Sequence, residues 1–233
     1  MASEELLHVV TPQMGFTGVV KPKSQVHRDG DWHVCVHGFV TDGTGRLLVQ
    51  YRGPMVNLMR ERWDFVSVAG HISASHEDSI DHNPAADGGP RAIDWLQLAI
   101  ETLIREFEEE IGVVLPREEF FGFDIFFIGI TRTDQQTEDG WWDRTFSFNF
   151  VIVEGVSTTG SEHIFPEELR LEPGKVLEVK WMDVGDIEAA LRRERPEIFA
   201  ERWPDQRRLV ASVIHAVQQV RDDVRWAEED QSD

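Results

Sequence analysis

The most informative stretch of this 233-residue chain reads Arg105-Glu-Phe-Glu-Glu-Glu-Ile-Gly-Val113. It closes a run that starts near residue 92, in which apolar residues recur at spacings of three and four, as on one face of a helix. These apolar residues are Leu96, Ile100, Leu103, Phe107 and Ile111. Gly112 follows where a left-handed C-terminal cap is expected. The pattern therefore predicts one amphipathic helix over residues 92–111.

Three glutamates crowd one flank of this predicted helix. At about 100° per residue, Glu106 and Glu110 fall on nearly the same helical line, and Glu109 lies one step round. Like charges three and four residues apart destabilise a helix, so the arrangement calls for a counter-charge. Arg105 precedes Glu109 by one turn and is predicted to hold it in position. A hard divalent cation such as Mg²⁺, which binds oxygen ligands, would supply further positive charge, whereas the alternative is an ordinary solvated acidic face.

Short runs rich in Val, Leu and Phe lie on both sides of the helix in the sequence. We predict strands at residues 6–10, 18–20, 33–41, 46–52, 65–69, 120–130, 145–153 and 176–182. We predict polar turns or loops at 27–31, 42–45, 73–92 and 131–143, further helices at 184–193 and 196–225, and a frayed acidic end from residue 227. Strands on both sides of one central helix favour an α+β fold in which helices flank a mixed β-sheet.

A family resemblance rests on these residues. Residues 105–113 match the pattern Arg-Glu-hydrophobic-x-Glu-Glu-x-Gly-hydrophobic, which is the second half of the signature of the Nudix hydrolase family. The chain resembles this family over about residues 25–185, and its stretches Val26-His-Arg-Asp-Gly-Asp-Trp-His33 and Ala69-Gly-His-Ile72 look like the branch related to isopentenyl-diphosphate isomerases. The resemblance implies an α/β/α sandwich that cleaves a nucleoside diphosphate linked to another moiety, with Mg²⁺ or Mn²⁺ as cofactor.

The same resemblance divides the chain into three parts. Residues 1–24 would form an N-terminal strand extension, residues 25–185 the Nudix domain, and residues 186–233 C-terminal helices with an acidic tail. Residues 73–92 are poor in apolar side chains and read as an insertion within the motif, because loops of that length are uncommon in compact domains.

Site residues follow from the resemblance and from side-chain chemistry. The resemblance implies Glu106, Glu109 and Glu110 as metal ligands, with the Gly70 carbonyl as a further ligand, and Glu109, Glu106 and Arg105 as the catalytic set. Guanidinium groups suit phosphate oxygens, so Arg52 and Arg62 are candidate substrate-binding residues, with surface arginines as the alternative. His71 adjoins the motif glycine and joins them as a candidate, whereas His33 and His37 are expected to be structural.

The chain departs from the family pattern at two places. Where the pattern has its first glutamate, eight residues before Arg105, this chain has Gln97, and either Glu77 or Glu101 could replace it. Before the strand at 176–182, Lys175 stands where related proteins often carry an acid. The missing carboxylate could then come from Glu162, Glu167, Glu168 or Glu178.

The position of Cys35 distinguishes the hydrolase hypothesis from the isomerase hypothesis. The isomerases use a cysteine in the strand just before the motif glycine, but this chain has Ser67-Val-Ala-Gly-His71 there. Cys35 is the only cysteine, lies in an apolar run and is predicted to be a buried structural thiol. A hydrolase is therefore the first hypothesis, a non-catalytic nucleotide-binding module the second, and an isomerase the third.

The net charge of the chain limits the kinds of partner that it can bind. The chain has 43 Asp and Glu residues against 23 Lys and Arg residues, a net charge of −20. Such a surface repels nucleic acid and anionic lipid, so we expect a small-molecule substrate, with neither nucleic acid nor membrane as a partner. A single cysteine and the lack of a signal-like start favour the cytoplasm. A homodimer is possible through a C-terminal apolar set: Ile198, Leu209, Val213, Ile214 and Val217.

Overall fold

The computed structural model describes residues 4–56, 60–74, 93–114, 123–137, 140–154, 166–192 and 206–230. The chain packs as two compact units, each made of three stretches. Unit 1 comprises Met1–Val36, Gly70–Thr102 and Ile130–Phe148, and unit 2 comprises His37–Ala69, Leu103–Gly129 and Asn149–Asp233. The predicted boundaries at 24/25 and 185/186 stay predictions, and the predicted insertion at 73–92 lies almost wholly outside the described residues.

Unit 1 contains a small two-stranded sheet and a short helix. Strands β1 (Leu6–Val10) and β2 (Phe16–Pro22) pair antiparallel, and helix α1 (Lys23–Asp29) follows directly. The predicted polar turn at 27–31 is therefore wrong over its first residues. Val26 is fully buried against Leu7 and Val9, so this one apolar side chain packs helix α1 against strand β1.

The main sheet has seven strands in the order β5-β4-β3-β8-β7, with β6 paired to β3 and β9 paired to β4. The strands are β3 (His33–Thr41), β4 (Arg46–Arg52), β5 (Trp63–Asp64), β6 (Val68–His71), β7 (Phe123–Gln136), β8 (Trp142–Glu154) and β9 (Val176–Asp183). Strand β4 runs antiparallel to β3, β5 and β9.

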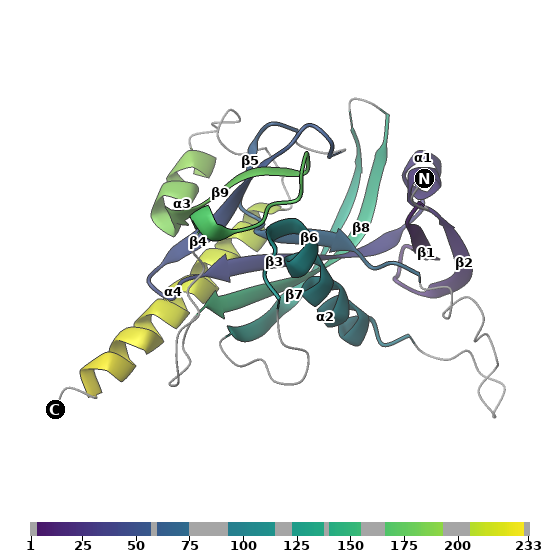
Figure 1. Ribbon diagram of the computed structural model, residues 1–233. Helices are drawn as coiled ribbons and strands as arrows, with labels where there is room; N and C mark the ends of the chain where they lie inside the picture. The colour runs from purple at the N-terminus through teal and green to yellow at the C-terminus, as the bar shows by residue number, and fades with distance from the viewer. Residues whose placement is uncertain are drawn as a thin grey trace. The chain divides into compact units, whose positions relative to one another are not determined.

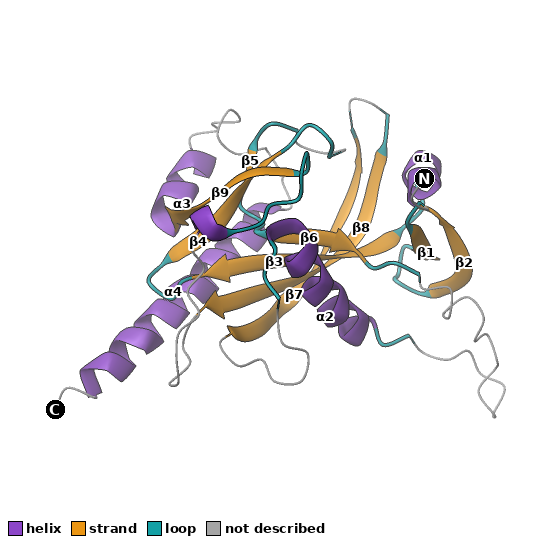
Figure 2. Cartoon of the chain, viewed as in Figure 1, coloured by secondary structure: helices purple, strands orange, loops and turns teal. Residues whose placement is uncertain are grey.

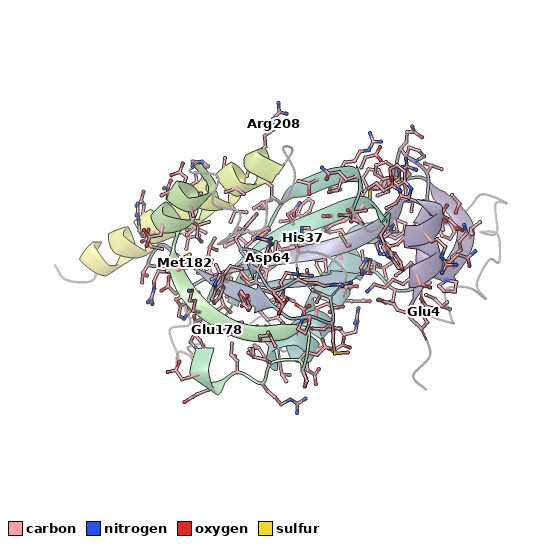
Figure 3. The ribbon with its side chains drawn as sticks, turned by 90° about the horizontal axis from the view of Figure 1, so that it is seen from above. Glu4, His37, Asp64, Glu178, Met182 and Arg208 are labelled. Carbon is pink, nitrogen blue, oxygen red and sulfur yellow. The ribbon has the colours of Figure 1, made fainter. Side chains whose placement is uncertain are left out.

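Side-chain pairs show that β3 and β8 run parallel. Cys35 contacts Ser147 and, two residues on, His37 contacts Asn149, so both strands advance in the same direction. The sheet is therefore mixed, as predicted. Cys35 is buried and forms no disulfide, which confirms its predicted packing, and Figure 3 labels His37 on its strand.

Several predicted strands have different bounds, and two of the differences change the fold description. The stretch predicted at 65–69 is interrupted, because the Asp64 carboxylate accepts a hydrogen bond from the Val66 N–H at 3.1 Å and turns the chain between β5 and β6. Strand β7 continues to Gln136 instead of ending at Ile130, so much of the loop predicted at 131–143 is strand. Thr131 and Thr133 favour this extension, since β-branched side chains fit the pleated sheet.

Helices cover both faces of the sheet within unit 2 (Figures 1 and 2). On one face, α3 (Val184–Arg192) and α4 (Gln206–Asp230) pack on β3 and β4 in a core that includes Phe39 and Leu47. On the other face, a Cβ on Gly38 would lie 2.8 Å from Leu103 and 3.4 Å from Phe107, so the helix that carries these residues packs directly on β3. Helices flank a mixed sheet, and the predicted α+β class is confirmed.

Helix α4 uses its apolar face within its own chain. Leu209, Val213, Ile214 and Val217 are buried in the core of unit 2, whereas Arg208 is exposed and points outward (Figure 3). These four side chains therefore pack within the chain, Ile198 lies outside the described residues, and the homodimer stays a prediction. The helix starts at Gln206 and continues past the predicted fraying point to Asp230. No helix among the described residues has the length and apolar character to cross a membrane.

Candidate active site

The glutamate-rich segment is not one regular α-helix. Helix α2 (Trp95–Glu106) continues as a π-helical turn, η1 (Phe107–Ile111), which ends at Gly112 with φ of 73°. The predicted left-handed cap is confirmed. A π turn holds more residues than an α turn, so spacing at 100° per residue no longer decides which side chains face inward. Phe107, Glu110 and Ile111 are buried in η1, whereas Glu108 and Glu109 are exposed.

Glu110 is a carboxylate inside the protein. Its side chain is 7% exposed and accepts a hydrogen bond from the Ala69 N–H of β6 at 3.1 Å. Burial raises the pKa of Glu110 to about 7, although the Ala69 N–H and the charges of Arg52 and Lys175 act in the opposite direction. The ionised form of this group therefore needs additional positive charge.

Arg105 joins the other two glutamates. Its Nη2 lies 2.7 Å from an oxygen of buried Glu106, and its Nη1 lies 2.9 Å from an oxygen of exposed Glu109. The predicted contact between Arg105 and Glu109 is present. One guanidinium therefore supplies charge to two carboxylates of the motif, which offsets the repulsion expected between them.

Two further cations act on Glu110 through their charges. Arg52, at the end of β4, is held by an ion pair with buried Asp64 at 3.3 Å. Burial opposes the charge of Lys175, but its hydrogen bond to Glu172 and the charges of Glu172, Glu106 and Glu110 raise its pKa above the usual value. Both cations are therefore fixed in their charged form near the acids, an arrangement that suits an anionic ligand.

A close backbone contact positions these cations. The Gly53 N–H donates to the Lys175 carbonyl at 2.6 Å, and a Cβ on Gly53 would lie close to the carbonyl oxygen of Gly174. Only glycine fits at this approach. The end of β4 and the turn before β9 are consequently held together next to the motif.

The donor set suits a hard cation. Glu106 and Glu110 are buried carboxylates, and oxygen ligands of this kind are what Mg²⁺ and Mn²⁺ take in proteins. Among the described residues, the three glutamates do not each bring an oxygen within 4.8 Å of the others. Arg105 binds two of them instead, so the side chains would have to turn toward a shared ion.

The remaining residues that the sequence predicted for the site lie in several different elements. Gly70 follows Ala69 on β6. Gln97 and Glu101 are exposed and hydrogen-bond each other at 2.8 Å, while Glu77 lies outside the described residues. Arg62 accepts the Arg52 N–H with its carbonyl at 2.9 Å, and the Nε2 of His71 lies 3.3 Å from that of His27. Among candidates for a further acid, Glu167, Glu168 and Glu178 are exposed (Figure 3 labels Glu178), and Glu162 is not described.

Glu172 is an acid that sequence reasoning missed. Its N–H donates to the Glu110 carbonyl at 2.9 Å, one carboxylate oxygen binds Lys175 at 2.9 Å, and the other is buried without a hydrogen-bond partner. The sequence contains a signal that could have found it. The search for a further acid near the strand at 176–182 included Glu178, after the start of the strand, and Glu172 lies before that start, three residues from Lys175.

These features define an α+β protein in which a carboxylate-bearing helix end and two cations meet at a mixed sheet. No family model matches the chain. Over 196 residues, or 83% of its length, the chain is 30% identical to Nudix hydrolase 3 of Arabidopsis thaliana, and it spans 21% of that relative's length.

The fold was also compared with solved structures. DR0079 from Deinococcus radiodurans superposes with a TM-score of 0.54 at 16% identity, covering 89% of this chain and 98% of that one. A NUDIX hydrolase from Alicyclobacillus acidocaldarius gives a TM-score of 0.44 at 16% identity over 71% of this chain and 87% of that one. The likeness to DR0079 shows a shared fold, and the similarity to the Arabidopsis protein supports the Nudix hydrolase family for this chain.

Proposed function

We propose that this chain is a metal-dependent hydrolase of the Nudix type that cleaves the pyrophosphate linkage of a nucleoside diphosphate derivative by attack of water at phosphorus. The observation that carries the proposal is Glu110, a buried carboxylate beside buried Glu106 and the cations Arg52 and Lys175. The reaction class is supported by the name of the Arabidopsis relative, a Nudix hydrolase.

Each residue has a proposed role. Glu106, Glu109 and Glu110 would hold Mg²⁺ or Mn²⁺, with the Gly70 carbonyl as a further ligand, and the ion would neutralise the diphosphate and lower the pKa of bound water. Arg105 positions Glu109 through their contact at 2.9 Å.

Substrate contacts and a further acid complete the site. Arg52 and Arg62 would bind phosphate oxygens, as guanidinium forks do. Glu172 takes the place of the acids suggested by the sequence as the candidate general base or further ligand, because it contacts Glu110 and has a buried carboxylate oxygen without a partner.

Replacement of single glutamates tests the metal assignment. Glu109→Gln and Glu110→Gln should each lower Mg²⁺-dependent turnover by about two orders of magnitude or more, because the amide keeps the shape but loses the charge that binds the ion. Glu108→Gln is the matched control, since Glu108 is an exposed neighbour on the same turn. Circular dichroism checks the fold, and full turnover in both site variants would refute the metal assignment.

A substrate screen separates catalysis from simple binding. Turnover is measured with Mg²⁺ or Mn²⁺ across dinucleoside polyphosphates, nucleotide sugars, dinucleotide cofactors and nucleoside triphosphates. The products are separated by chromatography, because cleavage of an internal pyrophosphate linkage gives two phosphate monoesters instead of free phosphate. The alternative, a non-catalytic nucleotide-binding module, draws on exposed Gln97 in place of the family's first glutamate. Binding without turnover across the whole panel would favour that module.

We further propose that the chain belongs to the branch of the family that resembles isopentenyl-diphosphate isomerases, because of the stretches at 26–33 and 69–72. Isomerase chemistry itself is disfavoured. Cys35 is buried and lies 3.0 Å from the Ser147 hydroxyl in the sheet interior, and no thiol precedes Gly70 on β6. Proton exchange into isopentenyl diphosphate would contradict this conclusion.

A further inference from the structure

The outer strand β7 is a feature that the hydrolase site leaves unexplained. It runs for 14 residues, Phe123–Gln136, whereas strands usually have about five or six. Among the described residues, β8 is the one strand that pairs with it, so β7 lies at an edge of the described sheet. The backbone N–H and C=O groups along such an edge can pair with a strand from another molecule.

Exposed apolar side chains gather in the middle of this strand. Phe126 is 48% exposed, Phe127 is 45% exposed and Ile130 is 46% exposed. Single exposed apolar side chains are ordinary, but a group of large ones in one place marks an interaction surface. Residues 125–131 also carry no charge, although the chain has a net charge of −20. A second acidic molecule can therefore approach this run without local repulsion.

The other outer strands are protected in ways that this part of β7 lacks. β5 has two residues and β6 has four, and each pairs with one strand of the sheet. β9 has eight residues and carries the charged residues Glu178, Lys180 and Asp183. Short length and charge are two of the means by which edge strands avoid pairing with other chains. Over residues 125–131, β7 has neither.

Gly129 leaves open space within the uncharged run. Its φ of 119° is one that residues with a Cβ rarely adopt, and its carbonyl accepts a hydrogen bond from the Asn149 amide at 3.1 Å. A Cβ added to Gly129 would meet no atom within 4 Å. A glycine inside a strand often marks a place where another backbone comes close. The strand continues past it to Gln136, so this irregularity does not end the edge.

The residues that flank the uncharged run have opposite charges. In the sequence, Asp124 precedes the run and Arg132 follows it. The Arg132 side chain is 53% exposed and its guanidinium lies 4.3 Å from the centre of the Trp32 ring, while the neighbouring Asp134 is paired with Arg144 at 2.9 Å. Dimers with two-fold symmetry are the commonest oligomers. A two-fold axis perpendicular to the sheet makes two β7 strands antiparallel, so the acidic end of each run meets the basic end of the other.

We propose that two copies of this chain form a dimer through antiparallel pairing of the outer edges of their β7 strands along residues 125–131. Phe126 of each copy lies close to Ile130 of the other, and Asp124 pairs with Arg132. The net charge of the chain argues against nucleic acid or anionic lipid on this surface. One strand pair buries less surface than a standard interface, so we expect a reversible dimer at about micromolar concentrations.

Sedimentation of the full chain over a range of micromolar concentrations tests the proposal. Phe126→Lys and Ile130→Lys should each weaken dimerisation by at least about tenfold, because a lysine on an edge strand opposes pairing. Leu177→Lys is the matched control, since it adds the same charge at a position of β9 that is 50% exposed. Circular dichroism checks the fold. A monomeric unaltered chain, or unchanged dimerisation in both β7 variants, would overturn the proposal.

An exchange of charges tests the antiparallel arrangement. Asp124→Lys and Arg132→Glu should each weaken dimerisation, because like charges then meet across the strand pair. An equimolar mixture of the two variants should recover the dimer, since the introduced lysine meets the introduced glutamate and the two unaltered residues also pair. A folding defect in either variant cannot produce this recovery. A mixture that dimerises no better than its components would show that the antiparallel arrangement is wrong.

Discussion

Burial separates the three glutamates of the motif more sharply than their spacing does. Glu106 and Glu110 are buried, whereas Glu109 is exposed, although all three belong to one short stretch. Glu106 and Glu109 share Arg105, but Glu110 relies on the Ala69 N–H and on the more distant charges of Arg52 and Lys175. Glu110 is therefore the residue whose charge depends most on a bound cation.

Metal-free protein should lose stability as the pH rises from about 4.5 to about 7. Glu110 keeps its proton up to about pH 7 in the folded state, whereas the unfolded chain releases it near 4.5. The folded state binds more protons in this window, so this group lowers the free energy of unfolding with rising pH, by up to about 3 kcal/mol. Urea unfolding with a chelator at pH 5 and pH 7.5 measures the difference.

Two variants isolate this effect. Glu110→Gln cannot titrate and should show a flatter dependence on pH, whereas Glu108→Gln should behave like the unaltered chain. The same pH dependence in Glu110→Gln and the unaltered chain would mean that other groups cause it.

Among the elements, the change from α2 to the π turn η1 decides which acids face inward. The turn ends at Gly112, whose positive φ of 73° lets its N–H reach the Phe107 carbonyl. A Cβ on Gly112 would lie 2.9 Å from the Cβ of Arg170 and 3.1 Å from its carbonyl oxygen. The segment that contains Arg170 leads to Glu172, so this glycine joins the two acid-bearing parts of the site.

Gly112→Ala should therefore weaken both stability and activity. The left-handed conformation alone costs a residue with a Cβ about 1–2 kcal/mol, and the contact with Arg170 adds to it. Gly112→Asn is the informative companion, because asparagine tolerates positive φ but still carries a Cβ. The expected result, measured by urea unfolding and turnover, is a loss in both variants that is smaller in Gly112→Asn, because asparagine avoids the cost of the left-handed conformation but keeps the contact with Arg170. Full recovery with asparagine would show that the backbone conformation alone matters.

The sequence predicts elements best where one periodicity holds from end to end. Strands β3, β4 and β9 and helix α3 were predicted to within about one residue, since their apolar patterns are continuous. Helix α1 was missed because Val26 is its one buried apolar residue. The π turn was missed because Phe107 and Ile111 fit an α-helical stripe equally well.

The candidate site was predictable only in part for a similar reason. Glu106, Glu109, Glu110 and their Arg105 partner lie in one contiguous motif, so local sequence is enough to find them. Glu172 comes from a separate segment, and its contact with Glu110 depends on a backbone hydrogen bond between segments that no local pattern predicts.

For the molecule as a whole, dissolved ions affect stability in two ways, by screening the net charge and by binding at the candidate site. The net charge of −20 makes the folded state repel itself, so any salt that screens this repulsion should stabilise it. Magnesium should do more than screen, because it also binds the carboxylates of the motif in the folded state, and binding to the folded state alone raises stability.

Thermal unfolding in NaCl and in MgCl₂ at equal ionic strength separates these two effects. We expect the midpoint temperature to rise with NaCl and to rise further with MgCl₂. The difference between the two salts should disappear in Glu109→Gln/Glu110→Gln, which keeps a strongly negative charge but lacks two of the proposed ligands. If MgCl₂ stabilised the double variant as much as the unaltered chain, magnesium would be acting on the acidic surface in general. The proposal that Glu109 and Glu110 bind the ion would then be refuted.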